Sequence, residues 1–88
     1  MNLLLIDDHP LFGLGFAHAV SHARPDVTVQ IAASIEQGLA LAARTPGIDI
    51  ALIDYRLGRD DGLAGLRRFG AQHPLVARVL ISGDEDAA

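Results

Sequence analysis

Acidic side chains follow two of the apolar runs in this sequence. Asp7 and Asp8 come directly after the first run, and Asp54 comes directly after the third. A hydroxyl side chain, Ser82, follows the fourth run. Carboxylates that meet at one place repel each other unless a cation lies between them, and Mg²⁺ prefers carboxylate and phosphate oxygens as ligands. A carboxylate beside such an ion can also act as the nucleophile in phosphoryl transfer.

The apolar runs have the length of β-strands and alternate with helix-sized segments. The runs cover 3–6, 27–32, 48–53 and 76–81, and the helical segments cover 11–23, 34–44 and 60–73. This alternation predicts parallel strands joined by right-handed crossovers, which is a doubly wound α/β sheet. Ligands of such sheets bind beyond the carboxyl ends of the strands. We therefore expect the three aspartates and Ser82 to converge at one end of the sheet.

Details of the runs and helices refine this arrangement. The run 27–32 alternates apolar and polar residues, which is typical of a strand with one wet face, so we place it at an edge of the sheet. Ser34 and Gln37 form a capping-box pattern at the start of the second helix. Apolar residues at helical spacing predict the buried side of the first helix: Phe12, Phe16, Ala19, Val20 and Ala23.

The composition fits one small domain with a core. The chain has 88 residues, is 50% hydrophobic and carries a net charge of −4, so it has no basic field for a nucleic-acid backbone. Cysteine is absent, which excludes disulfides, thiol catalysis and zinc sites with Cys ligands. No run is long enough to span a bilayer, and the N-terminus lacks the features of a signal peptide. We therefore expect a cytoplasmic domain that binds neither nucleic acid directly nor a membrane.

The residues around the acids resemble those of a known family. The segments 4–12, 49–57 and 79–83, together with the pair Asp61-Gly62, are similar in order and spacing to response-regulator receiver domains of two-component systems. The resemblance is strongest to regulators with a LuxR/NarL-type DNA-binding output, and it covers the whole chain. It implies a flavodoxin-like sheet of order 2-1-3-4-5, of which this sequence holds the first four strands in the order 2-1-3-4.

The resemblance also implies a role for each site residue. Asp54 would accept a phosphoryl group from a sensor histidine kinase and would be one ligand of Mg²⁺. Asp8 would bind the ion directly, Asp7 directly or through water, and Arg56 through its backbone carbonyl. Ser82 would be the switch hydroxyl that turns toward the phosphoryl oxygens. The domain would then not be an enzyme, apart from self-phosphotransfer and autodephosphorylation, and would control transcription within a longer parent.

Two features depart from the family pattern. Gly58 stands where the family commonly has Pro. The sequence also ends before the family's fifth strand and helix, which hold a Lys that pairs with the phosphoryl group and an aromatic switch residue. Since this sequence has no Lys, we expect weak phosphorylation of the 88-residue chain. The uncovered run 76–81 predicts a homodimer formed through an exposed strand edge.

Two other functions remain open, and one residue near the acids remains ambiguous. The absence of Lys would also suit a degenerate receiver that only binds proteins, whereas the intact set of three aspartates favours retained metal chemistry. A phosphohydrolase of the haloacid-dehalogenase type uses an aspartate nucleophile and a second Asp two residues apart after the first strand. Here Asp7 and Asp8 are adjacent and Asp54 follows the third strand, so the spacing disfavours this class. We interpret His9 as a loop residue at the rim of the site, with tuning of the site as the alternative.

Overall fold

A computed structural model describes residues 1–57 and 60–81 of the chain. Its elements in chain order are β1 (Asn2–Ile6), α1 (Pro10–Ala23), β2 (Thr28–Ala32), α2 (Ile35–Arg44), β3 (Ile50–Asp54), β4 (Arg56–Leu57), β5 (Asp60–Asp61), α3 (Gly62–Gln72) and β6 (Ala77–Ile81). None of the described helices combines the length and apolarity that crossing a bilayer requires.

The main sheet is parallel and has the order β2-β1-β3-β6. β6 corresponds to the fourth predicted strand, so this order is the expected 2-1-3-4. The expected doubly wound α/β class is therefore confirmed. β2 lies at an edge, as its alternating pattern predicted. β1 and β3 are direct neighbours, with Ile6 opposite Ile53, so the residues that follow these two strands emerge side by side.

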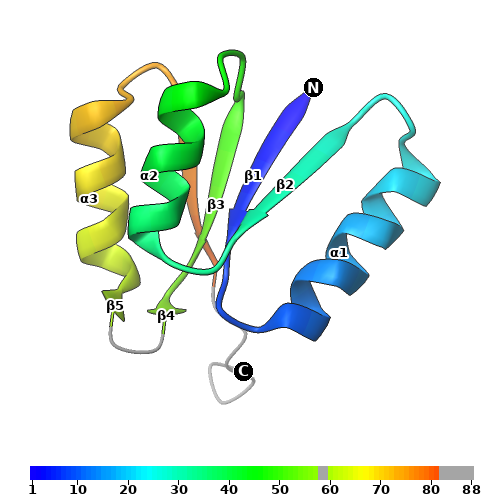
Figure 1. The fold of residues 1–88 in the computed structure, drawn as a ribbon, viewed down its shortest axis with the longest axis horizontal. Helices are drawn as coiled ribbons and strands as arrows, with labels where there is room; N and C mark the ends of the chain where they lie inside the picture. The colour runs from blue at the N-terminus through cyan, green and yellow to red at the C-terminus, as the bar shows by residue number, and fades with distance from the viewer. Residues whose placement is uncertain (58–59, 82–88) are drawn as a thin grey trace.

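One face of the sheet is covered by α2 and α3, which lie next to each other (Figure 1). The main core lies between these helices and the sheet, and it includes Leu4, Ile6, Ala32, Ile35, Leu39, Ala51, Ile53, Leu57 and Phe69. A Cβ atom on Gly38 would overlap the side chain of Ile6, so α2 lies closer to β1 than a larger residue would permit. This close packing accompanies the complete burial of Leu4 and Ile6, the two β1 side chains that belong to this core.

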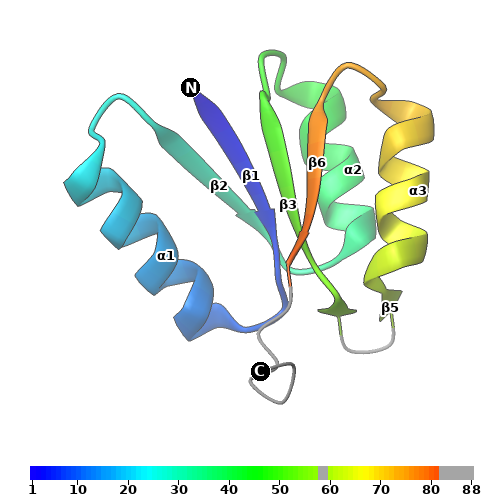
Figure 2. The ribbon, with the colours of Figure 1, turned by 180° about the vertical axis from the view of Figure 1, so that it is seen from behind.

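The opposite side carries α1, which packs against β2 and lies apart from α2 and α3 (Figure 2). Its one buried residue is Gly13, which faces the side chain of Ile31. The predicted buried side of this helix is correct only in part, because Phe12 is 50% exposed, and Ala19 and Ala23 are exposed as well. The physical reason is that no other described helix lies beside α1 to cover the rest of its apolar surface.

β6 forms the other edge of the sheet within the described residues. A nearly continuous apolar run usually indicates a strand buried on both faces. In β6, however, Ala77, Arg78 and Val79 are exposed, and Leu80 and Ile81 are only partly buried. Within the part of the chain that the structure describes, the strand is therefore an exposed edge, as expected for the run 76–81.

Local contacts define the starts of α2 and α3. Ser34 Oγ accepts a hydrogen bond from the N–H of Gln37 (3.2 Å), which is one of the two bonds of the predicted capping box. Gln37 Oε1 accepts its hydrogen bond from the N–H of Ala33 (2.9 Å), the residue before the cap, and not from Ser34, so the second half of that prediction is wrong. The two-residue strands β4 and β5 pair in an antiparallel way just before α3, and the sequence did not predict them. Asp61 then caps α3 by accepting a hydrogen bond from the N–H of Leu63 (3.0 Å).

Candidate metal centre

Three aspartates lie at the carboxyl ends of β1 and β3. The N–H of Asp7 extends the pairing of β1 with β2 by donating to the carbonyl of Ala32 (2.9 Å), and Asp54 is the last residue of β3. Asp7 and Asp54 are 6% and 7% exposed, whereas the side chain of Asp8 is 33% exposed. The structure therefore brings these three carboxylates together where the sequence placed them, and their chemical roles stay predictions.

The imidazole of His9 also belongs to this group. Its Nδ1 atom lies 2.7 Å from Asp7 Oδ1, 3.1 Å from Asp8 Oδ1 and 3.6 Å from Asp54 Oδ2. One ligand atom from each of the four side chains lies within 4.8 Å of all the others. His9 is a loop residue, as interpreted from the sequence. Its ring does more than line the rim of the site, because it points toward the three carboxylates.

The local backbone explains this orientation. The N–H of His9 donates a hydrogen bond to Asp7 Oδ1 (2.7 Å), which is the same oxygen that lies near the ring. Pro10 follows, and a residue before proline is restricted to extended conformations. His9 has φ −104° and ψ 97°, in agreement with that restriction. The proline directly after the Asp-Asp-His segment is thus a sequence signal for the extended backbone of His9, which lets the ring reach the carboxylates.

The carboxylates change the acid–base behaviour of His9. The hydrogen bond to Asp7 raises the pKa of the His9 imidazole above its ordinary value of 6.5, and the negative charges of Asp7, Asp8 and Asp54 raise it further. Asp8 Oδ1 is shielded from solvent yet accepts no hydrogen bond from the described residues. An acidic group with a shielded oxygen that accepts no hydrogen bond suits a divalent cation, so the residues present fit a bound metal ion.

The end of β3 is held by backbone contacts around Asp54. The N–H of Arg56 donates to Asp54 Oδ1 (3.1 Å) and thereby orients the carboxylate. The N–H of Gly62 donates to the carbonyl of Tyr55 (3.0 Å), so the start of α3 lies directly against the site. Arg56 is exposed in β4, two residues beyond Asp54. Ser82, the predicted switch hydroxyl, lies outside the described residues.

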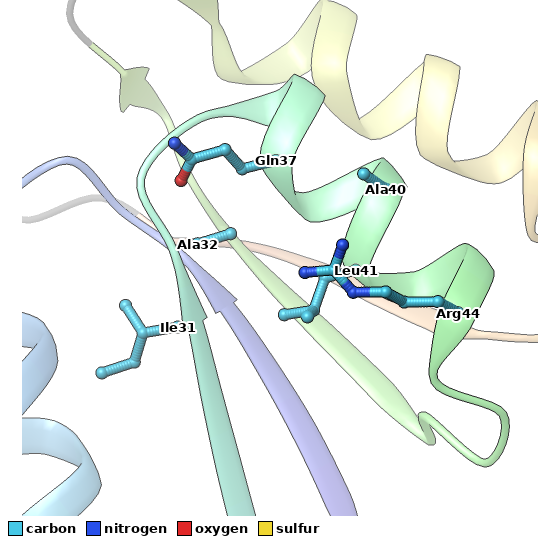
Figure 3. A pocket seen from close by; sticks show the side chains of 6 residues that line it. All are labelled: Ile31, Ala32, Gln37, Ala40, Leu41 and Arg44. Atoms are coloured by element: carbon cyan, nitrogen blue, oxygen red, sulfur yellow. The ribbon is translucent and has the colours of Figure 1, made fainter.

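A separate hollow of about 210 Å³ lies between β2 and α2 (Figure 3). It is lined by Ile31, Ala32, Gln37, Ala40, Leu41 and Arg44. Its polar groups are one guanidinium and one amide, and the amide oxygen of Gln37 already accepts the hydrogen bond from Ala33. Because no lining residue is acidic, this hollow is distinct from the candidate metal centre.

Comparison with known proteins decides the family. A model of the response regulator receiver domain matches residues 3–88. The chain belongs to the response regulator receiver domain family. The receiver is 27% identical over 84 residues to the glycerol metabolism activator of Pseudomonas putida, covering 96% of this chain and 38% of the relative. It is 35% identical over 81 residues to the transcriptional activator protein ExaE of the same species, covering 91% of this chain and 36% of the relative.

A solved structure shares the fold of the receiver. A response regulator from Burkholderia pseudomallei, with a phosphorylated aspartic acid, a calcium ion and citrate, superposes with a TM-score of 0.82 at 24% identity. The match covers 94% of this chain and 47% of that chain. The receiver therefore spans less than half the length of this relative and of both curated activators.

Proposed function

We propose that this receiver accepts a phosphoryl group on Asp54 from a sensor histidine kinase, with Mg²⁺ held by Asp7, Asp8 and Asp54. The observation that carries the proposal is that two neighbouring strands bring these carboxylates within 4.8 Å of one another. A bound divalent ion would offset the negative charge of the incoming phosphoryl group. The backbone carbonyl of Arg56 is proposed as a further ligand, and Ser82 as the hydroxyl that contacts the phosphoryl oxygens.

Asp54 is suited to act as the nucleophile. It is 7% exposed, and the N–H of Arg56 fixes its Oδ1 atom, so the carboxylate is held in one orientation. In the proposed step, an Asp54 oxygen attacks the phosphorus of a phosphohistidine, and an O–P bond forms. The P–N bond of the donor breaks, and its electron pair remains on the imidazole nitrogen. The domain thus receives a phosphoryl group and does not turn over a separate substrate.

The relatives support a role in transcription. The curated relatives are activators, and the receiver covers only 38% and 36% of them, so we propose that it acts within a longer regulator whose output lies outside this domain. The phosphorylated aspartate and calcium ion named for the Burkholderia protein support the chemistry proposed for Asp54. A kinase partner that draws on ATP makes the cytoplasm the proposed location.

The decisive experiment measures intact mass after incubation with acetyl phosphate and Mg²⁺. We expect the chain to gain the mass of one HPO₃ unit, at low yield because it has no Lys, and Asp54→Asn to gain none. Asp26→Asn is the matched control, because Asp26 is an exposed aspartate that pairs with Arg24 away from the site. An adduct that persists in Asp54→Asn would contradict the proposal.

Two other outcomes would point to the alternative functions. A folded chain that takes up no phosphoryl group over a long incubation would indicate a degenerate receiver that only binds proteins. Steady turnover of a generic phosphoester such as p-nitrophenyl phosphate would indicate a phosphohydrolase. Either result would overturn phosphoacceptance as the main function.

We also propose that two copies associate through β6. Its pairing with β3 occupies one edge of the strand, and the described residues offer no strand on the other edge. Val79 within β6 is 44% exposed. An unpaired apolar edge of this kind favours pairing with another chain.

A further inference from the structure

A nitrogen donor lies among the carboxylates of the candidate metal centre. His9 Nδ1 is 2.7 Å from Asp7 Oδ1, 3.1 Å from Asp8 Oδ1 and 3.6 Å from Asp54 Oδ2. In an octahedral site with bonds of about 2.1 Å, adjacent ligand atoms lie about 3 Å apart. The three observed separations bracket that value, so Nδ1 lies where an adjacent ligand of the same ion would lie.

The backbone positions this ring at the site, where Nδ1 shares a hydrogen bond with Asp7 Oδ1. The backbone contact with Asp7 and the restriction imposed by Pro10 place His9 beside the carboxylates. The His9 side chain is 65% exposed and makes no capping hydrogen bond to α1, although His9 occupies the position before that helix. Among the described residues, the ring nitrogen Nδ1 contacts Asp7, Asp8 and Asp54, so the orientation of the ring serves the site.

The donor set determines which ions fit. Mg²⁺ binds through oxygen atoms, whereas imidazole nitrogen suits first-row transition metals, and Mn²⁺ accepts both kinds of donor. We propose that His9 Nδ1 is a fourth side-chain ligand and that the site therefore binds Mn²⁺ in preference to Mg²⁺. This inference rests on the carboxylate site of the proposed function and adds to it the identity of the preferred ion.

The test uses Mn²⁺ as the probe, at a pH above the pKa of His9 so that the imidazole is neutral. The electron paramagnetic resonance signal of free Mn²⁺ gives the affinity, and competition with Mg²⁺ gives the preference. Electron spin-echo modulation by ¹⁴N then reports a directly bound imidazole. We expect His9→Gln to lose the ¹⁴N modulation and to lower the Mn²⁺ to Mg²⁺ preference about tenfold.

Controls separate this inference from the function on which it rests. His18→Gln removes an exposed histidine of α1 and should leave both the ¹⁴N modulation and the preference unchanged. Circular dichroism confirms that each variant is folded. Equal preference in the unaltered chain and His9→Gln, without ¹⁴N modulation in either, would overturn the role of His9 while the carboxylate site stands. Mn²⁺ binding that is absent, or unaffected by Asp8→Asn, would overturn the carboxylate site itself.

Discussion

The backbone N–H of Gly62 donates a 3.0 Å hydrogen bond to the carbonyl oxygen of Tyr55, directly beyond the proposed phosphoacceptor. A Cβ atom at Gly62 would overlap the backbone oxygen of Asp54 and crowd the backbone of Tyr55, and a strand end cannot yield as a flexible side chain would. We therefore expect Gly62→Ala to lower the free energy of unfolding by about 2 kcal/mol, as overpacking does. Urea denaturation measures the change.

Gly15→Ala is the matched control for that substitution. Gly15 lies within α1, and a Cβ atom there would have no neighbour within 4 Å. Because alanine has the higher helix propensity, we expect either no change or a gain of up to about 1 kcal/mol. Equal destabilisation by both substitutions would show that the contact of Gly62 with the end of β3 is not the cause.

Phe69 and Phe12 offer a second paired comparison. Phe69 is fully buried between α3 and the sheet, whereas Phe12 is 50% exposed on α1. Phe69→Ala should cost about 3 to 5 kcal/mol, because it removes core packing and leaves a cavity. In a domain this small that loss approaches the whole stability. Phe12→Ala should lower the free energy of unfolding much less. Thermal unfolding followed by circular dichroism compares the two variants. Similar losses of stability in both would contradict the described packing of α1.

The carboxylates around His9 predict the pH dependence of the ion-free domain. Because its pKa in the folded state is raised above 6.5, the charged imidazole stabilises the fold fully below that pH. This contribution is lost as the pH rises through the raised pKa. An NMR titration of the His9 ring should give a midpoint above 6.5, assigned by the loss of its signal in His9→Gln. A midpoint at or below 6.5 would show that the ring does not contact Asp7 in solution.

The direction of the peptide groups in β6 provides a test of self-association. The N–H of Ala77 donates to the carbonyl of Asp49, and the carbonyl of Ile81 accepts from the N–H of Tyr55, so the peptide groups of these two residues face β3. Because the peptide groups of successive residues in a strand face opposite edges, the N–H of Arg78 points away from β3. Arg78→Pro removes this outward donor without removing a hydrogen bond to β3, and it should abolish dimer formation in light scattering across a concentration series. Arg78→Ala, which loses only the side chain, should still associate. A monomer at every concentration before substitution would refute the proposed dimer.

The arrangement of the strands could be predicted because it depends on short apolar runs. Those runs gave the four parallel strands and the edge position of β2, and the ends of the strands gave the meeting of Asp7, Asp8 and Asp54. These features follow from one rule, since parallel strands place their carboxyl ends at one edge of the sheet.

Other features depend on contacts that no local pattern encodes. The pair β4 and β5 contains only two residues per strand, so it produces no recognisable periodicity. The spacing of apolar residues in α1 indicates an apolar side but not which neighbours cover it, and half of Phe12 remains exposed. The direction of the His9 ring depends on a side-chain rotation, although Pro10 restricts the backbone before it.

The pairing of β1 with β3 has a thermodynamic consequence for the whole fold. Asp7 and Asp54 are far apart in the chain and become neighbours only when these strands pair, so the unfolded polypeptide has no comparable binding site. Any ion that binds between them selects the native state and raises the melting temperature in proportion to the logarithm of its concentration. Conditions that deplete divalent ions would therefore loosen the centre of the sheet as well as the site at its end.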